Sequence, residues 1–433
     1  MGSVAFADGT VPPAFTIESA VHTAIERNPT VQNDRDKINE EDATIKFAWA
    51  QVFPTISGIG TYNELKNAVN TGSGAFNGTA FNDYDAELKL SQPLYQAGAI
   101  SSGIASVQKE RQARQYDLEV AERDLTTQVL SAFYGVLVNQ RNLEILHDTE
   151  GVLKQYVATT KHYLTIGRAQ LLDSLQAQTQ LALIYPQIAN AENSMKAQGS
   201  QLAQLLHLSD MSQIQVNGKM AALDRAQVNE MLKKRKPELP ESSASALRIG
   251  ETQDTHVVLM SSYYPSAQFL ANIGRNSNAF SDIFNDDSTN WSFGVQFTIP
   301  IFSGLSSVHE RSVLAAQLNQ AEDTRATLVD QLNFNAVSAE TSLNESEVAL
   351  ETSQKAAELG KASLKEGQRD YKLQTISALQ FLTVQQTYLT SEQSYMTAKY
   401  NYLLALGTFF VAKGIPISIL IDLLEHNPAP EDS

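Results

Sequence analysis

Seven histidines are the side chains of this sequence best suited to metal binding or acid–base chemistry, and they are scattered along its 433 residues. No pair has the spacing with which two histidines hold a metal ion from one helix, and the sequence has neither a G-x-S-x-G motif nor a phosphate-binding loop. Gly58 and Gly60 lack the third glycine of a dinucleotide-binding turn. The sequence therefore predicts no catalytic centre, no metal site and no cofactor. The histidines are His22, His147, His162, His207, His256, His309 and His426.

The overall composition excludes further classes of function. Acidic side chains outnumber basic ones by 48 to 32, which is a formal net charge of −16, and the nearest approach to a basic tract is the short run Lys233–Lys236. Because nucleic-acid binding needs clustered Lys and Arg, no nucleic acid is expected as a partner. Cysteine is absent, and this removes disulfides, thiolate catalysis and a lipid-anchored N-terminal cysteine.

No apolar run approaches the ~20 residues that a membrane-spanning helix needs. If this chain spans a membrane, it must therefore do so as a closed β-barrel. The N-terminal Ala5-Phe6-Ala7 resembles the A-x-A end of a secretory signal peptide, which predicts removal of a leader after Ala7.

The chain also repeats itself, because four pairs of landmarks recur in order at offsets of 207 to 211 residues. This predicts two similar halves, at 8–217 and 218–410, followed by a C-terminal segment at 411–433. In each half we expect helices, then two strands around a polar loop, then a long helical hairpin. The landmark pairs are Asn28-Pro29 with Lys236-Pro237, Phe53-Pro54 with Tyr264-Pro265, Pro93-Leu94-Tyr95 with Pro300-Ile301-Phe302, and Gly167 with Gln374.

Two-residue alternation marks the predicted strands, near 54–65, 83–94, 264–275 and 291–302. From Trp291 to Ile299 every second residue is apolar, so the large side chains share one face. In the strand at 83–94 the opposite face carries Asp83, Asp85 and Glu87, as a water-filled lumen requires. Strands of about 9–11 residues suit a tilted bilayer crossing, and the polar loops at 66–82 and 275–290 are then expected to be extracellular. Aromatic residues that would form interfacial girdles are Tyr62, Tyr84, Tyr264, Trp291 and Phe302.

Four strands cannot close a barrel, and an open sheet edge cannot face lipid. Several chains must therefore contribute, and twelve strands from three chains are the simplest arrangement that leaves a lumen. The predicted fold class is an α+β membrane protein with a twofold internal repeat. In it a trimeric twelve-stranded transmembrane β-barrel continues into a long periplasmic α-helical barrel.

The helical hairpins, at 101–208 and 307–406, are too long for a globular domain. A single helix from Ser101 to Leu164 would be about 95 Å long. Apolar residues recur in narrow seams with spacings of 7, 4 and 3, which is typical of coiled coils. Pro186 is expected to kink or break its helix.

The chain resembles the TolC family of outer-membrane channels over residues 15–410. The opening Ile17-Glu18-Ser19-Ala20 with Asn28-Pro29 is similar to the N-terminal helix of the family. Gln92-Pro93-Leu94-Tyr95-Gln96-Ala97-Gly98 and Ile299-Pro300-Ile301-Phe302-Ser303-Gly304 are similar to its strand-exit motif. Tyr163-Leu164-Thr165-Ile166-Gly167 and Ala398-Lys399-Tyr400-Asn401-Tyr402 are similar to its hairpin tip and last helix.

The resemblance implies a homotrimer in the outer membrane that extends into the periplasm. It also implies a periplasmic adaptor, or membrane fusion protein, and an inner-membrane transporter as partners. The turns that would meet the adaptor are Ile166, Gly167, Arg168 and Ala169 in one hairpin and Gln374, Thr375, Ile376 and Ser377 in the other. Gly167 permits the positive φ that a tight turn often needs, whereas the second turn lacks the family's glycine.

The resemblance also places the gate of the tube at these tips. Asp173 and Tyr371 occupy partner positions, and a phenol-to-carboxylate hydrogen bond of about 1–3 kcal/mol is expected to help hold the aperture shut. Gln380 and Thr383 fall where the best-known relative has rings of aspartate. The constriction is therefore expected to lack a carboxylate ring.

The residues leave two questions of function open. The alternative to a channel is a soluble coiled-coil scaffold or interaction protein, although that interpretation leaves the strands and the repeat unexplained. Within the channel interpretation, drug efflux, metal export and type I protein secretion all use such a tube, so the cargo is undetermined.

Overall fold

The computed structural model describes residues 14–70, 76–208, 214–220, 223, 225–235, 238–277, 279–281 and 289–426. The predicted cleavage site at Ala7 lies outside these residues. The chain divides into two compact units. The helical unit comprises Met1–Arg35, Asp117–Pro240 and Leu328–Ser433, and the sheet-bearing unit comprises Asp36–Tyr116 and Glu241–Thr327.

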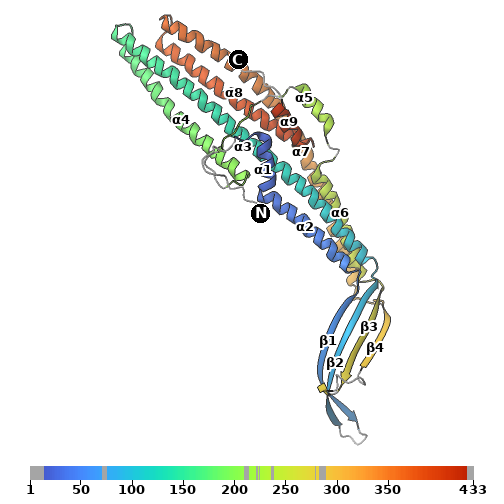
Figure 1. The fold of residues 1–433 in the computed structure, drawn as a ribbon. Coiled ribbons are helices and arrows are strands. Elements are labelled where there is room, and N and C mark those ends of the chain that lie inside the picture. The colour runs from blue at the N-terminus through green and yellow to red at the C-terminus, as the bar shows by residue number, and fades with distance from the viewer. Residues whose placement is uncertain are drawn as a thin grey trace. The chain divides into compact units, whose positions relative to one another are not determined.

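An antiparallel sheet of four strands in the order β1-β2-β3-β4 forms one end of the sheet-bearing unit (Figure 1). The strands are β1 (Thr55–Asn70), β2 (Phe76–Tyr95), β3 (Ser266–Ser277) and β4 (Thr289–Thr298). All four predicted strands are present, but β1 and β2 are longer than predicted. Most of the predicted loop at 66–82 is paired strand, from Lys66 opposite Ala80 to Asn70 opposite Phe76. The sequence missed this extension of β1 and β2 because two strands can pair through their backbones without any alternation of apolar and polar side chains.

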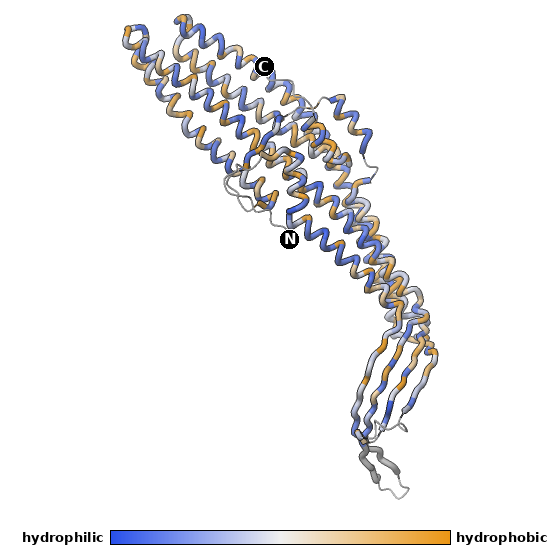
Figure 2. Tube along the Cα trace, in the orientation of Figure 1, coloured by the Kyte–Doolittle hydropathy of each residue, from blue (hydrophilic) through white to orange (hydrophobic). Residues whose placement is uncertain are grey.

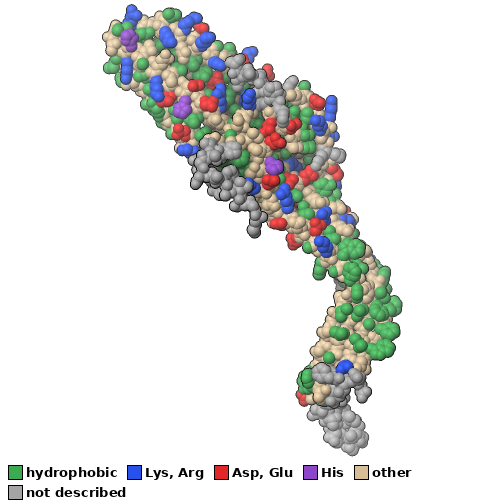
Figure 3. Space-filling view, viewed as in Figure 1, with side chains coloured by type: hydrophobic (Ala, Val, Ile, Leu, Met, Phe, Trp, Pro, Cys, Tyr) green, Lys and Arg blue, Asp and Glu red, His purple; other side chains and the backbone are tan. Residues whose placement is uncertain are grey.

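The two faces of this sheet differ in chemistry. In the register of the sheet Leu88 lies opposite Ile273, which lies opposite Trp291, and this row is exposed on the apolar face. On the other face the Asn272 amide donates to Glu87 and the Asn276 amide donates to Asp83, at 3.3 and 2.8 Å. Figure 2 shows the alternation along the strands, and Figure 3 shows hydrophobic side chains gathered over β4.

The helices of the two halves recur with equal lengths. α3 (Ala99–Thr165) and α7 (Ser306–Lys372) each have 67 residues, and α4 (Leu171–Leu205) and α8 (Ala378–Ala412) each have 35. α2 (Pro29–Ala50) and α6 (Pro240–Ser261) each have 22. The compact units cut across this repeat, because each unit takes segments from both halves. α4 continues through Pro186, so the proline does not break the helix.

In the helical unit α3 lies beside α4 and α8, and α7 lies beside α8 (Figure 1). α3 meets α8 through hydrogen bonds between Ser131 and Tyr400 and between Asn142 and Gln393. Each hairpin packs closely at a glycine. A Cβ added to Gly135 of α3 would collide with the side chain of Gln198 of α4, and one added to Gly360 of α7 would collide with Ser391 of α8. Among the described residues, none of the helices is both long enough and apolar enough to cross a bilayer.

Short helices cover the core of the helical unit. They are α1 (Ile17–Arg27), α5 (Arg225–Met231), the 3-10 turn Leu232–Lys234 and α9 (Ile417–His426). The predicted C-terminal segment from residue 411 begins with the end of α8 and continues into α9, whose Leu420 is fully buried. Glu425 of α9 accepts a hydrogen bond at 3.1 Å from the backbone N–H of Glu18, in the first turn of α1. That position suits a carboxylate, because helix N-termini carry partial positive charge.

Truncation of Leu420 tests the importance of α9. We expect Leu420→Ala to lower the free energy of unfolding of the helical unit by about 2–5 kcal/mol, because a fully buried leucine leaves a cavity. Urea unfolding followed by helical circular dichroism measures it. Leu373→Ala is the control and should change little, because Leu373 is exposed.

Candidate gate and docking site

Both hairpin tips use the same turn. The amide of Arg168 donates to the carbonyl of Tyr163 at 2.8 Å, and the amide of Gly167 donates to that of Leu164 at 3.1 Å. The second tip repeats this pair, since Thr375 donates to Asp370 and Gln374 donates to Tyr371, both at 3.0 Å. These are the paired bonds of a Schellman motif, which ends a helix through a residue with positive φ.

The residues with positive φ are Gly167, at 75°, and Gln374, at 60°. The left-handed conformation is unstrained for glycine, whereas a side chain there costs about 1–2 kcal/mol. The expected positive φ at Gly167 is therefore confirmed. The second turn keeps the same geometry without glycine, so it is the more strained of the two.

Capping residues close both turns on their far side. The carboxylate of Asp173 accepts a hydrogen bond from the backbone N–H of Gln170 at 3.0 Å. In the second hairpin the side-chain oxygen of Gln380 accepts a hydrogen bond from the backbone N–H of Ser377 at 2.8 Å. In return, the hydroxyl of Ser377 accepts one from the backbone N–H of Gln380. Asp173 and Gln380 therefore occupy the same place in the two repeats, as the third residue of their helices.

Tyr371 has a different partner from the predicted one. Its hydroxyl lies 3.2 Å from Thr160 Oγ1, in a buried position. Thr160 uses its own proton to bond the carbonyl of Tyr156 at 2.8 Å, so Tyr371 is the donor in this pair. Within the described part of the chain, no hydrogen bond joins Tyr371 to Asp173. The expected phenol-to-carboxylate bond is absent within one chain, because Asp173 is held by its own helix end.

An aromatic cluster surrounds Tyr371 and joins the two hairpins. The ring of Tyr371 lies 4.9 Å from that of Tyr156 and 5.2 Å from that of Phe381. The hydroxyl of Tyr156 donates to the carbonyl of Ala378 at 3.3 Å, and that of Tyr163 donates to the carbonyl of Lys372 at 3.1 Å. Burial and the neighbouring Tyr371 raise the pKa of Tyr156, so this phenol stays a neutral donor.

The sequence did not single out this cluster. The spacing of Tyr156, Thr160 and Tyr163, by 4 and 3 residues, does indicate that the three side chains share one face of α3. That spacing alone does not say which helix the face meets. Only the packing of α3 on α7 and α8 turns it into a connection between hairpins.

The proposed docking residues are mostly exposed. Ile166, Arg168, Gln374, Thr375 and Ser377 are exposed, as is the Gly167 backbone, while Ala169 and Ile376 are half-buried. Beside them a groove of about 800 Å³ lies between α4 and α8. Exposed Leu172 and Leu175 line it, and so does Thr383. Gln380 points its side-chain oxygen into the capping contact instead.

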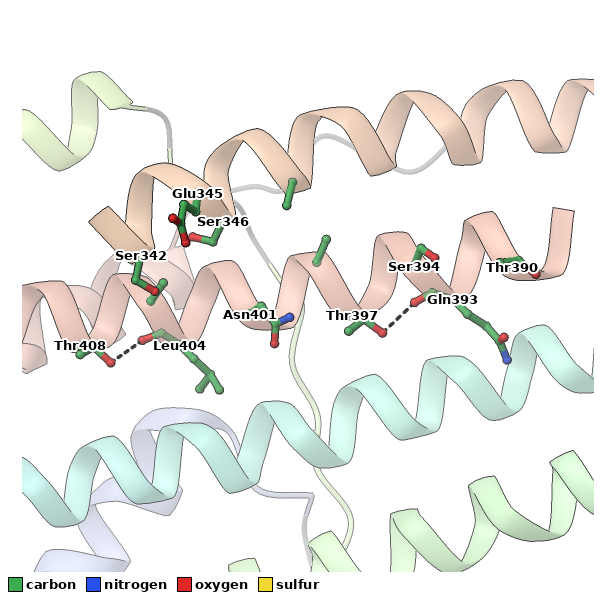
Figure 4. A pocket seen from close by; sticks show the side chains of 13 residues that line it. Ser342, Glu345, Ser346, Thr390, Gln393, Ser394, Thr397, Asn401, Leu404 and Thr408 are labelled. Atoms are coloured by element: carbon green, nitrogen blue, oxygen red, sulfur yellow. Dashed lines mark hydrogen bonds between the residues drawn. The ribbon is translucent and has the colours of Figure 1, made fainter. Parts of the chain in front are cut away.

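A second groove of about 780 Å³ lies between α7 and α8 (Figure 4). Its walls are mainly small polar side chains, such as Ser342, Ser346 and Thr397, with Glu345 as the charged member. Hydroxyls such as that of Thr397 donate a hydrogen bond to a backbone carbonyl one helical turn earlier, here that of Gln393. Among the described residues no group of His, Cys, Asp or Glu is arranged to hold a metal ion.

The model of the family "Outer membrane efflux protein" matches residues 20–207 and 231–412. The chain therefore belongs to the outer membrane efflux protein family. Proteins of this family are passive outer-membrane channels and not enzymes.

Two curated relatives are similar in sequence. "Outer membrane protein TolC" of Vibrio cholerae is 24% identical over 262 residues, which is 58% of this chain and 59% of that protein. "Alkaline protease secretion protein AprF" of Pseudomonas aeruginosa is 22% identical over 233 residues, which is 52% of this chain and 47% of that protein. The chain thus matches about half the length of these relatives.

The fold is shared more widely than the sequence. Crystal structures of CusC, described in connection with its folding and transmembrane channel formation, superpose with a TM-score of 0.78 at 16% identity. The superposition covers 95% of both chains. The predicted fold class is confirmed: the chain has the fold of the trimeric TolC-type channels, with long helical hairpins and four strands per chain.

Removal of the Tyr371 hydroxyl tests the gate. We expect Tyr371→Phe to raise single-channel conductance or open probability, because it removes a buried hydrogen bond of about 1 kcal/mol between the hairpins. Thr160→Val should have a similar effect, and the double variant should add little since both changes remove the same bond. Recordings in planar bilayers measure both quantities, and conductance and open probability unchanged in both variants would exclude this gate.

Proposed function

We propose that this chain is the outer-membrane exit duct of a tripartite efflux pump or a type I secretion system. Three copies form a passive channel with a periplasmic extension. A periplasmic adaptor, which is bound to an inner-membrane transporter, opens the channel at the hairpin tips.

The observation that carries this proposal is the sheet. Large apolar residues of β4, such as Phe293 and Phe297, are exposed on one face, while Asp83 and Glu87 lie on the other. The outer strands β1 and β4 each pair on one side only in the described sheet. Such a sheet is stable in lipid only when its free edges pair with other copies and its apolar face meets acyl chains. Twelve strands from three chains satisfy both demands.

The helical unit supports the same assembly. Both α4 and α7 carry exposed apolar side chains. On α7, Val337, Val348 and Leu359 recur every 11 residues and share one stripe. Leu183 and Tyr185 are exposed on α4. Contact between α7 of one chain and α4 of the next would cover both sets and close a ring of helices.

Opening follows from the geometry of the tips. The α3–α4 and α7–α8 hairpins are connected near their ends by the aromatic cluster and three hydroxyl bonds. An adaptor that grips the exposed turns can part these contacts without unfolding either hairpin, because each turn is closed by its own Schellman and capping bonds. The residues assigned to docking are the two predicted turns, and Tyr371 with Thr160 is assigned to the gate.

The cargo is the open part of the proposal. AprF is named for alkaline protease secretion and the family for efflux, and these names support a secretion or an efflux role for this chain in equal measure. In either role the transporter selects the cargo and the duct conducts it. A soluble coiled-coil scaffold has no use for an exposed apolar sheet face.

Reconstitution tests the proposal. Purified protein should require detergent, give the mass of a trimer in native mass spectrometry and form ion-conducting channels in planar bilayers. In cells that lack a channel of this type, the gene with its neighbouring transporter genes should restore export. Monomers that remain soluble without detergent would contradict the channel and support the scaffold.

A further inference from the structure

Two buried polar side chains in the core of the helical unit have no hydrogen-bond partner. Thr149 of α3 is 2% exposed, and Gln385 of α8 is 3% exposed. Within the described part of the chain, no hydrogen bond reaches the Oγ1 atom of Thr149 or the Nε2 atom of Gln385. Buried polar groups are almost always paired, so these two exceptions call for an explanation.

The hydroxyl of Thr149 differs from those of other threonines on the same helix. Four threonines of α3 donate a hydrogen bond to the carbonyl four residues earlier, which is common in helices. They are Thr126, Thr127, Thr159 and Thr160. Thr149 makes no such bond, so its own helix does not satisfy its hydroxyl.

Hydrogen bonds between α3 and α8 fix the level of the two unpaired side chains. Asn142 accepts from the amide of Gln393 at 2.9 Å, and Tyr156 donates to the carbonyl of Ala378 at 3.3 Å. Thr149 lies seven residues from each of these two α3 residues, and the unpaired glutamine lies seven and eight residues from their α8 partners. Since a helix rises evenly by about 1.5 Å per residue, both side chains lie at one level, between two hydrogen-bonded levels.

Both side chains interrupt an apolar stripe of their helix. The buried neighbours one turn from Thr149 are Leu146 and Leu153, and those of the glutamine are Phe381 and Leu389. All four belong to one hydrophobic cluster, whose apolar side chains offer no hydrogen bond. A polar group that loses water on burial and gains no partner weakens the packing that buries it.

We propose that Thr149 and Gln385 make this level a built-in weak point of the seam between α3 and α8. The closed seam holds both groups away from water. When α8 moves away from α3, both groups can bond water, so the helices separate more easily here than at an apolar level. In the channel, the weak point lets the two hairpins part above their tips while each hairpin stays intact. This role in opening rests on the proposed function, whereas the weakness of the seam does not.

Replacement of each polar side chain by an apolar one of similar shape tests the weak point. The variants are Thr149→Val and Gln385→Met, and the measurement is hydrogen exchange on the intact protein in detergent. Amides of α3 and α8 near this level should exchange about fivefold more slowly in each variant than in the wild type. The reason is that each change removes an unpaired polar atom and keeps the apolar contacts.

Matched substitutions in the same two helices should act differently. Thr160→Val removes a buried hydroxyl that bonds Tyr156 and Tyr371, so exchange should become faster, although the substitution is the same as at residue 149. Gln386→Met changes the exposed neighbouring glutamine and should match the wild type.

Unchanged or faster exchange in either Thr149→Val or Gln385→Met would overturn the weak point. The removed group would then already be satisfied inside the closed seam, by a bound water molecule or by the other side chain. The same slowing in Gln386→Met would also overturn it, because burial would then not be the cause.

Single-channel recording in planar bilayers tests the role in opening. The variant that carries both Thr149→Val and Gln385→Met should have an open probability about fivefold lower than the wild type, because its closed seam is more stable. An equal or higher open probability would overturn this role. Absence of channels in the wild type would contradict the proposed function and this role with it, while hydrogen exchange would still decide the weak point.

Discussion

Replacement of Gly167 by tryptophan is expected to abolish export while trimers still assemble in the outer membrane. The φ of Gly167 is 75°, and no atom lies within 4 Å of the position that a Cβ would take. Inside the chain the substitution therefore meets open space and costs only the strain of a left-handed residue, about 1–2 kcal/mol. The loss of export would come from the exposed turn, where an indole blocks the approach of an adaptor tip.

The chain supplies a matched control for this experiment. Gly151 of α3 is also exposed and also has nothing within 4 Å of its missing Cβ. Gly151→Trp should keep export, because residue 151 lies more than three helical turns from the tip. Measurements are the export of the transporter's substrate and the trimer band on an unheated gel. Export that persists in Gly167→Trp, with trimers intact, would remove the first turn from the docking site.

Gln374→Gly extends the comparison to the second tip. Glycine relieves the strain of φ 60°, so this variant should fold at least as stably as the wild type. Export should be retained if backbone geometry alone is recognised there. Loss of export with a stable trimer would show that the Gln374 side chain itself contacts the partner.

Replacement of Phe293 by arginine is the second change with a large expected effect. Phe293 is 69% exposed on the apolar face of β4, where the proposed channel meets lipid. An arginine at the bilayer midplane costs about 2–4 kcal/mol, and a trimer carries the change three times. We expect little or no heat-modifiable trimer in the outer-membrane fraction.

Gln296→Arg is the control, because Gln296 lies on the opposite face of the same strand. Its amide oxygen accepts a hydrogen bond from Gln268 at 3.2 Å, in an exposed position. A charge on a lumen face stays hydrated, so trimers of this variant should form in normal amounts. Equal loss of trimers in both variants would mean that the apolar face does not meet lipid.

Local pattern was enough for the sequence to predict most of the elements and both tips. Alternation from Trp291 to Ile299 predicted β4 and its apolar face, since side chains of a strand point to opposite faces in turn. The offset of 207 residues linked Gly167 with Gln374, and both residues have positive φ in the structure. The family resemblance rested on the same short motifs.

Properties that depend on contacts between distant segments were decided by the tertiary structure. The sequence places Asp173 and Tyr371 198 residues apart, and spacing cannot say whether each is already engaged. The structure engages Asp173 in a local cap and Tyr371 with Thr160. It also brings Tyr156 and Phe381 together and buries one face of α9 in the core of the helical unit.

Residue type, alternation and repeat spacing are local and survive in one dimension, so the sequence by itself determined the fold class, the internal repeat and the position of the tips. A buried hydrogen bond depends on which helix faces lie opposite each other. That choice is made when α3 packs against α7 and α8, and only the tertiary structure shows it.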